Sequence, residues 1–467
     1  MTTGTFTSTQ RLGQYLAQAA TRPLRNDVAT KAAICLIDAL GLAVVAREET
    51  TAKAARRVIL PTSQGVSSIW ADGTRASPAD AAFANGIAVH AHFQDDTDHV
   101  SWSHPGSLVP PVAIALVEAS GGSVAQALRA LVAGYAVMNW LGVDEIVSRR
   151  LIARGMRTSP TFGTIGAAAA GAAALGLGAD EAASAVAIAA STTGGTLEPV
   201  RCGSDEWRIQ NGRAAQGGLL AALMAQQGVV GAPDALCGRR GFLMALAGMD
   251  APPDAWKTDP DPSIMLQIMA KPFATLGDNM PAVMAARAAR AHGIEPARIC
   301  SIRVTLWRPY SEYPGTAFKG PFERIVQTQA STAFAVAAML IHGDLTYEMG
   351  TTGRSDPLLN ALVAKTTIVP DDERGALDST VTVTLKDGSI VTADAKEAPE
   401  TLLFQNEARA VEVFRERFSR AGLQADAAGD LAARILGAAA GERPMPVADI
   451  FDAIRAALQT EGRRAHA

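Results

Sequence analysis

The sequence predicts a mainly α-helical fold, with a large helical domain and a smaller α+β unit inserted into it. Up to about residue 270, apolar residues recur at helical spacing and strand patterns are nearly absent. Between about 271 and 402, alternating β-branched stretches are found. From Gln405 onward helical spacing returns, and these last helices need an apolar surface, most economically that of the first domain. We therefore expect a helical domain over 1–270, an α+β lid domain over 271–402, and a return to the helical domain over 403–467.

The first part of the chain contains a succession of helical patterns. The stretch from Pro78 follows a capping signal, Ser77-Pro78-Ala79-Asp80. Glycines recur along the later stretches, and such small residues let helix axes approach closely. The predicted helices cover residues 26–45, 78–92, 109–119, 124–140, 164–175, 180–190 and 212–227.

The second part combines strands with helices. Residues 299–306 alternate and are β-branched, and Lys386-Asp387-Gly388 is a hairpin signal between 380–385 and 389–394. Residues 366–369 could form a further strand, so we expect three or four strands in all. Helices are expected at 328–341 and 357–365, and in the tail at 407–421, 426–440 and 447–460.

Composition limits the classes of function. The chain has 467 residues, of which 48% are hydrophobic and 19% charged, as in an ordinary globular protein rather than a disordered one. Lys and Arg number 42 against 46 Asp and Glu, a net charge of −4 without a basic block. This balance argues against nucleic acid or an anionic membrane as a partner.

Cysteine usage and the N-terminus suggest a location. The four cysteines lie far apart without a CxxC pair, so reduced thiols are expected rather than disulfides or a zinc site. The N-terminal residues lack the pattern of a signal peptide. The uncharged stretch 158–179 is built mainly of Gly, Ala, Thr, Ser and Pro, which gain little from insertion into a bilayer. We expect a soluble, cytoplasmic protein.

The densest polar cluster lies between two apolar helical segments. It has the sequence His90-Ala-His92-Phe-Gln-Asp95-Asp96-Thr97-Asp98-His99, followed by His104-Pro105-Gly106. His and carboxylate side chains at this spacing could bind a metal. They could equally perform acid/base chemistry, with His104 titrating near neutrality. The third interpretation is a solvated loop with helix-capping aspartates.

Cationic and phenolic side chains occur at three other places. Arg149, Arg150, Arg154 and Arg157 could bind a carboxylate, although such a run is more often a solvated face. The segment 203–213, with Arg208 and Gln210, precedes a predicted helix whose N-terminus could hold a carboxylate. Lys271 lies at the junction of the two units, where a ligand cleft is favoured, or else it is a surface lysine. Tyr313 could act as a phenolic acid or simply form part of a turn.

Several of these segments together resemble the MmgE/PrpD family, which includes 2-methylcitrate dehydratase, cis-aconitate decarboxylase and iminodisuccinate epimerase. The element Asp95-Asp96-Thr97…His104-Pro105-Gly106, followed by Val109-Pro-Pro-Val-Ala-Ile-Ala, is similar to the family's most specific motif. Further similarities, in family order, are Asp38-Ala-Leu-Gly41, residues 163–177, Gly212-Arg-Ala-Ala-Gln-Gly, Lys271-Pro272 and Gln329-Ala-Ser331. The resemblance implies a helical domain with an α+β lid, a homodimer, no metal and no organic cofactor.

The chain also departs from the family pattern. Phe93 stands where an acid is usual, and Ser159 where many members have His. Leu276, Gly277 and Met280 replace a segment that often holds His or a Cys–Arg pair, and Trp207 and Arg208 stand where a lysine is expected. His104, Asp95, Thr97 and Lys271 match the family. These departures suggest a substrate less polar than citrate-like acids.

The resulting hypothesis is a cofactor-independent lyase that removes a proton next to a carboxylate, or loses water or CO₂ there, on a small carboxylated substrate. His104 would carry the proton, Asp95 and Thr97 would position it or the substrate, and Tyr313 would supply an acid. Fixed cations must stabilise the enolate-like charge, and we expect Lys271 and Arg208 in this role, with Arg154 or Arg157 as further candidates. Ser159 and Gln210 would contact the substrate.

Other functions remain open from the sequence. An epimerase would use the same proton removal and return without a leaving group. A binding protein could retain the fold without chemistry, and a metal-dependent hydrolase is the most distant alternative. The lyase hypothesis requires that His104 and Lys271, far apart in the chain, meet in one crevice under the inserted unit.

Overall fold

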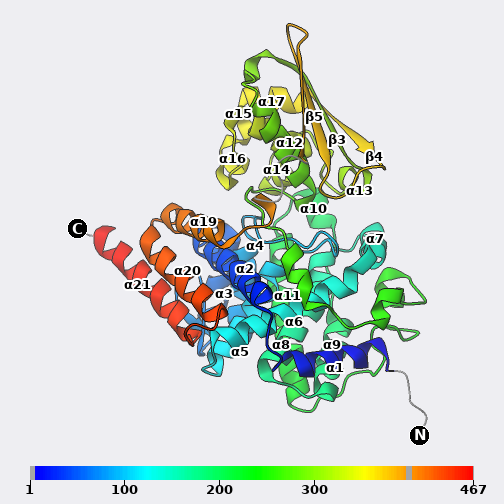
Figure 1. Ribbon diagram of the computed structural model, residues 1–467, viewed down its shortest axis with the longest axis vertical. Helices are drawn as coiled ribbons and strands as arrows, with labels where there is room; N and C mark the ends of the chain where they lie inside the picture. Colours follow the sequence, from blue (N-terminus) through cyan, green and yellow to red (C-terminus); the bar gives the residue numbers. More distant parts are fainter. Residues whose placement is uncertain (1–5, 396–401, 466–467) are drawn as a thin grey trace.

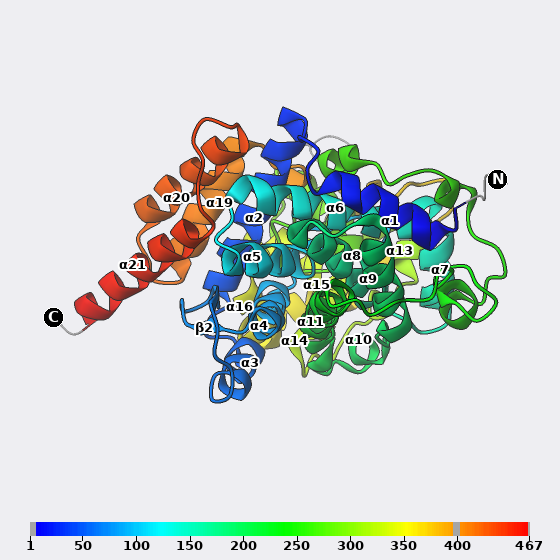
Figure 2. The same cartoon turned by 90° about the horizontal axis from the view of Figure 1, so that it is seen from below.

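A computed structural model describes residues 6–395 and 402–465. Helices hold 60% of the residues, so the mainly α-helical prediction is confirmed. In Figure 1 the helical part forms the lower body, and a sheet with its covering helices stands above it. Figure 2, seen from below, shows α20 and α21 flanking the other helices on one side.

The helical part contains the longer helices of the chain. Their bounds are α1 Ser8–Ala19, α2 Asn26–Val45, α3 Thr50–Ile59, α4 Pro78–His90, α5 Pro110–Ala119, α6 Val124–Gly142, α7 Ile146–Ala153, α8 Thr158–Leu175, α9 Ala179–Thr192, α10 Glu198–Cys202 and α11 Glu206–Gln226. The tail adds α19 Glu407–Arg420, α20 Ala425–Ala439 and α21 Ala448–Ala465.

Helix α8 lies at the centre of this part, and every residue in it except Leu175 is buried. Its small residues explain the close packing. A side chain at Gly163 would place its Cβ 2.5 Å from Leu108, and one at Gly218 of α11 would lie 2.5 Å from the carbonyl oxygen of Thr164. A larger residue at either position would therefore displace its neighbour, which is backbone of α8 in the case of Gly218.

The α+β unit contains a four-stranded sheet in the order β4-β3-β5-β6. The strands are β3 Ile299–Trp307, β4 Thr366–Asp371, β5 Ser379–Leu385 and β6 Ile390–Asp394. β3 pairs parallel with β4 and antiparallel with β5, and β5 forms a hairpin with β6. The predicted hairpin turn is confirmed, with Gly388 at a φ of +86°. The helices are α12 Met280–Arg290, α13 Arg308–Ser311, α14 Ile325–Ala330, α15 Thr332–His342, α16 Tyr347–Thr351 and α17 Pro357–Ala364.

Two hydrophobic cores divide the described chain. One draws on residues 12–268 and 414–457, and the other on residues 269–403. The tail is fixed to the helical part by a buried ion pair, in which Arg417 of α19 donates to Asp38 of α2 at 2.7 Å. A third, small cluster around Phe93 and Trp207 also includes Leu276 and Val326, and therefore joins the two parts.

Several predicted boundaries were wrong. The helix expected at 212–227 begins at Glu206, so Arg208 and Gln210 lie within α11 rather than before it. The helix expected at 328–341 is two helices, because Ser331 caps α15 by accepting from the backbone N–H of Phe334. The pattern revealed neither the two-residue strands β1 (Ser67–Ser68) and β2 (Arg75–Ala76) nor the helices α1, α3, α7, α10, α12, α13 and α16.

Within the part of the chain that the structure describes, two helical stretches are long and apolar enough to cross a membrane, Asn26–Val45 and Val124–Ala153. The uncharged stretch 158–179, which was considered as a membrane span from the sequence, is not one of these two. In their most apolar windows 89% and 72% of the residues are buried within the protein, as expected for core helices. Length and composition alone therefore give only weak evidence for a membrane span.

Candidate functional site

The polar cluster forms the loop between α4 and α5, and its aspartates have different roles. Asp96 fastens the loop, because its carboxylate accepts from the backbone N–H of Gly106 at 2.7 Å and from the hydroxyl of Tyr135 at 2.6 Å. Gly106 is required for this contact, since a Cβ there would lie 2.9 Å from the Asp96 carboxylate. The carboxylate of Asp98 accepts a hydrogen bond from the hydroxyl of Ser101, a contact within the same loop. These two aspartates are structural.

A small cavity of about 30 Å³ lies where this loop meets the α+β unit. It has room for about two water molecules. The polar side chains of its wall come from both parts of the chain: Thr97, His99, His104, Arg157 and Ser159 from the helical part, and Asp278, Tyr310 and Tyr313 from the other. Convergent polar groups in an enclosed space make this the candidate active site.

His104 and Thr97 lie side by side on the cavity wall. The Nδ1 atom of His104 is 3.0 Å from the Oγ1 atom of Thr97, and its backbone N–H donates to Ser159 Oγ at 3.2 Å. Burial holds the pKa of His104 well below its usual range, and the nearby Lys271 ammonium lowers it further. The imidazole is therefore neutral at pH 7, and a neutral imidazole can accept a proton.

Arg157 is the N-terminal cap residue of α8 and is buried. Its guanidinium donates to the carbonyl oxygen of Trp207 at 2.7 Å, to Gln210 Oε1 at 2.9 Å, and through Nη2 to His90 Nε2 at 3.1 Å. A guanidinium has five N–H donors. Within the described residues these bonds use three of them, which leaves two for a ligand. A carboxylate is the ligand that such a fork prefers.

The bond from Arg157 also fixes the state of His90. Arginine can only donate, so His90 Nε2 must accept, and the proton must be on Nδ1. That Nδ1 atom lies 2.8 Å from Asp95 Oδ2 and donates to it. Burial lowers the pKa of His90 to about 4, and the charge of Arg157 adds to this effect. Asp95, His90 and Arg157 thus form a buried chain in which the neutral imidazole joins an anion to a cation.

Lys271 lies behind the cavity wall and is fully buried. Its Nζ atom is 3.9 Å from Asp95 Oδ1, and neither atom has a hydrogen-bond partner among the described residues. Burial lowers the pKa of Lys271 to about 8, with Asp95 and other carboxylates opposing the effect. Burial alone would raise the pKa of Asp95, but the hydrogen bond from His90 and the charge of Lys271 hold it below its usual range.

Phe93 separates Lys271 from the cavity. The lysine Nζ lies 4.3 Å from the centroid of the Phe93 ring, whose own centroid is 5.2 Å from that of His104. His104 and Lys271 therefore both contact one aromatic ring, but His104 and Phe93 line the cavity whereas Lys271 does not. The backbone of Phe93 has a φ of +58° and that of Trp102, also in the wall, +54°. Such conformations cost about 1–3 kcal/mol each and are concentrated at functional sites.

Most of the other residues predicted for the site do not line the cavity. Arg208 does not reach the cavity, because it donates to the carbonyl oxygen of Ala91 and to Asp205. Gln210 contacts Arg157 rather than the cavity. Of the four arginines in the run, Arg157 is buried in the site, whereas Arg149, Arg150 and Arg154 are exposed. Arg149 pairs with Glu145, so the solvated-face interpretation holds for these three only.

Sequence reasoning missed Asp278. This residue lies just before α12 and lines the cavity across from the helical part. Burial raises its pKa to about 7, so the carboxyl can carry a proton at neutral pH. Nothing in the local sequence indicates this, because the burial is caused by residues distant in the chain.

The metal interpretation is not supported by the directions of the side chains. His90 points to Asp95, whereas the ring of His92 stacks on Tyr347 with a centroid distance of 4.0 Å. The two histidines of the HxH pattern thus have separate surroundings. Among residues 6–395 and 402–465, no three His, Cys, Asp or Glu side chains are grouped so that they could hold a metal ion.

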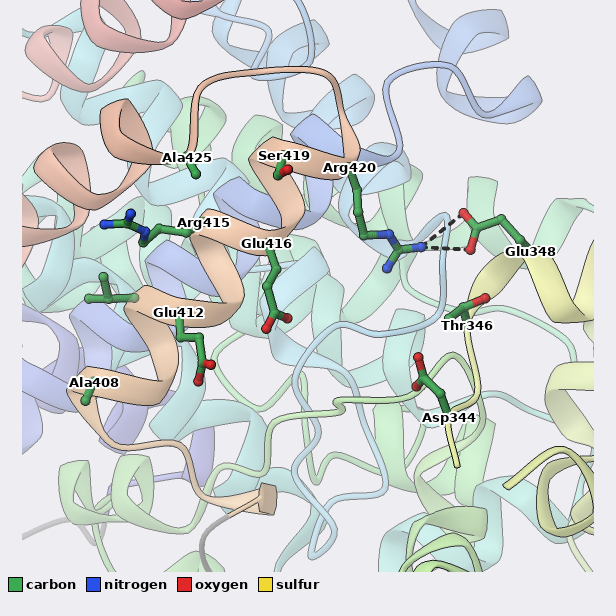
Figure 3. A pocket seen from close by; sticks show the side chains of 11 residues that line it. Asp344, Thr346, Glu348, Ala408, Glu412, Arg415, Glu416, Ser419, Arg420 and Ala425 are labelled. Atoms are coloured by element: carbon green, nitrogen blue, oxygen red, sulfur yellow. Dashed lines mark hydrogen bonds and ion pairs between the residues drawn. The ribbon is translucent and has the colours of Figure 1, made fainter. Parts of the chain in front are cut away.

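A larger groove of about 870 Å³ lies elsewhere, between α19 and the segment 344–348 (Figure 3). Its charged side chains are exposed, and Arg420 forms an ion pair with Glu348 at 2.8 Å across it. Asp344, Glu412 and Glu416 also line it. This groove offers no buried acid or base, so the small cavity remains the candidate site.

Comparison with known protein families identifies two matching domains in the chain. The model of the MmgE/PrpD N-terminal domain matches residues 10–254, and that of the MmgE/PrpD C-terminal domain matches residues 279–413. The chain belongs to the MmgE/PrpD family. The site described above lies where the two family domains meet, with His104 and Arg157 in the first and Tyr313 in the second.

Curated members of the MmgE/PrpD family resemble the chain at low identity. A cis-aconitate decarboxylase-like protein, oryM, of Aspergillus oryzae is 29% identical over 48% of each chain. The cis-aconitate decarboxylase of Homo sapiens is 33% identical over 38% of this chain and 37% of its own length. That of Mus musculus is 26% identical over 79% of this chain and 78% of its own. The first two matches thus span half of those proteins or less.

Proposed function

We propose that this chain is a lyase of the dehydratase or decarboxylase type that acts on a small carboxylate by side-chain acid/base chemistry. The observation that carries the proposal is His104, a buried neutral imidazole held by Thr97 at the wall of an enclosed cavity that Arg157 also lines. The names of the family relatives support the class of reaction.

His104 is the proposed base. Its pKa is low because it is buried near the cations Lys271 and Arg157. An anionic ligand would bring a negative charge close to the imidazole and raise its pKa towards neutrality. The base would therefore gain strength when a carboxylate binds, and a base is most effective when its pKa is close to the working pH.

Arg157 is the proposed carboxylate-binding group. The enolate-like charge that develops when a neighbouring C–H bond breaks must be stabilised by donors already in position. Arg157 meets this need, because Trp207, Gln210 and His90 fix its orientation. This assigns to Arg157 the role that the sequence suggested for Arg208.

Side chains of the site can accept and donate every proton that the proposed reaction moves. In dehydration, His104 takes the proton next to the carboxylate, the C–H electron pair forms a C=C bond, and the C–O bond on the adjacent carbon breaks. The departing hydroxide takes a proton from Tyr313 or Asp278 and leaves as water. In decarboxylation, the C–CO₂ bond breaks, CO₂ leaves, and the electron pair left on the carbon takes a proton from Tyr313 or Asp278. Burial raises the pKa of Tyr313, which keeps its proton at pH 7, and raises the pKa of Asp278 to about 7, so that about half of this carboxyl carries a proton.

The cavity must enlarge to admit such a substrate, since about 30 Å³ holds only water. Part of the contact between the α+β unit and the loop is made by aromatic rings at the cavity wall. Trp102 packs against Tyr310 and Trp307 at centroid distances of 5.5 and 6.0 Å. We propose that parting of these rings opens the site.

A substrate screen tests the proposal. The purified protein is incubated with hydroxy-, amino- and unsaturated mono-, di- and tricarboxylates, and products are read by mass spectrometry. Loss of water or CO₂ supports a lyase. Exchange of the proton next to the carboxylate in D₂O without net loss of substrate indicates an epimerase instead. Ligand-induced thermal stabilisation without product or exchange across the whole panel would identify a binding protein.

A further inference from the structure

The ring of Phe93 occupies the centre of the site and is almost completely buried. It lies 5.2 Å from His104, 5.2 Å from His90 and 4.6 Å from Trp207, measured between ring centroids. Each contact is edge-on or tilted, as aromatic rings prefer. The ring is thus held on several sides and does not merely fill a gap.

Behind this ring lies a second set of charges that the cavity does not reach. Lys271 Nζ and Asp95 Oδ1 are buried, 3.9 Å apart and without hydrogen-bond partners among the described residues. On its other side, the ammonium has the face of Phe93 at 4.3 Å. A cation over an aromatic face is attracted to the ring, and this partly replaces the missing hydrogen bonds.

We infer that Phe93 is the specificity-determining residue of the site: it keeps the Lys271 ammonium away from the ligand and thereby selects small acids with one carboxylate and an apolar remainder. The single carboxylate binds Arg157, and the apolar remainder packs on the Phe93 ring. This inference rests on the proposed function, because it assumes that the ligand is a carboxylate in this cavity.

The physical reason is the cost of an unpaired charge. A second or third carboxylate directed at position 93 would lose its water and meet an aromatic ring instead of a cation. Without Phe93, the same carboxylate would face Lys271 directly. The side chain at position 93 therefore decides between acids with one charge and acids with several.

Chemical labelling of Lys271 tests whether Phe93 shields this lysine, and it does not require that the protein turn over a substrate. Reductive methylation with formaldehyde and borohydride at pH 7.5, followed by peptide mass spectrometry, compares Lys271 with the exposed Lys257. We expect Lys271 to react at least tenfold more slowly in the native protein and in the matched variant Phe93→Leu. In Phe93→Ala it should react at least fivefold faster than in the native protein. Equal rates for Lys271 and Lys257 in the native protein would overturn the inference.

Binding measurements test the selectivity. Calorimetry compares butanoate, succinate and propane-1,2,3-tricarboxylate on the native protein, Phe93→Leu and Phe93→Ala. We expect the native protein and Phe93→Leu to bind butanoate at least tenfold more tightly than the tricarboxylate. In Phe93→Ala this ratio should fall at least tenfold. An equal or opposite preference in the native protein, or an unchanged ratio in folded Phe93→Ala, would refute the inference.

These results also separate this inference from the proposed function. If Phe93→Ala does not fold, the native preference and the native labelling rate still decide the question. If the selectivity is as expected but no acid is turned over or exchanged, the lyase proposal fails while the role of Phe93 stands. If acids are turned over and tricarboxylates are preferred, the reverse holds.

Discussion

The Nη2 atom of Arg157 donates to Nε2 of His90 at 3.1 Å, and this one bond connects the cavity wall to the buried carboxylate of Asp95. It fixes both the direction of the guanidinium and the tautomer of the imidazole, since arginine cannot accept. The orientation of the proposed carboxylate-binding group thus depends on a histidine that the ligand does not touch.

Arg157→Lys is therefore expected to impair ligand binding. Lysine keeps the charge but cannot reproduce the planar fork, and it leaves His90 Nε2 without its donor. Hydrogen bonds to charged groups contribute about 1.5–3 kcal/mol each, so we expect kcat/KM to fall about 10- to 100-fold. Steady-state kinetics on the substrate found in the screen measures this change. Arg150→Lys, at an exposed neighbouring position, is the control and should have no effect.

Lys271 should make stability depend on pH in the alkaline range. Its pKa is about 8 in the folded protein and about 10.5 when unfolded, so the unfolded chain binds more protons between these values. The contribution of Lys271 to the free energy of unfolding therefore rises as the pH increases from about 8 to 10.5, by at most about 1.4 kcal/mol for each pH unit. Urea denaturation at pH 7.5 and 9.5 measures it. Lys271→Met should lack this rise, and an identical pH dependence in both proteins would contradict the expected burial.

His92 should make the protein sensitive to acid. Burial lowers its pKa from 6.5 to about 3, so the folded state resists a proton that the unfolded chain accepts. Stability is then lost as the pH falls from about 6.5 towards 3. His92→Phe keeps the stacking on Tyr347 and removes the titrating group. We expect the variant and the native protein to have equal free energies of unfolding at pH 7.5. At pH 5 the variant should be more stable than the native protein by up to about 2 kcal/mol. A variant as acid-sensitive as the native protein would disprove this role.

The sequence predicted the fold and the location of the site better than the individual residues. Helical spacing identified most of the helices, and Lys386-Asp387-Gly388 identified the hairpin, because these signals are local. The sequence could not distinguish Arg157 from Arg208, nor from Arg149, Arg150 and Arg154, as the arginine of the site. Which of these faces the cavity depends on where α8 and α11 begin.

Long-range burial explains the remaining differences. Asp278 titrates near neutrality only because the folded chain buries it, and no nearby residue indicates this. Phe93 was recognised as a departure from the family pattern, but its contacts with both His104 and Lys271 require the tertiary fold. Pairs that are distant in the chain, such as Asp95 with Lys271, carry no signal in a single sequence.

The most direct test of the central claim follows the proton next to the substrate carboxylate. Proton NMR in D₂O on the acid identified by the screen compares the native protein with His104→Ala, and circular dichroism confirms that the variant is folded. If His104 is the base, the native protein produces deuterium exchange or a new alkene signal, and the variant is at least about 100-fold slower. A folded His104→Ala protein that reacts at the native rate would contradict the account.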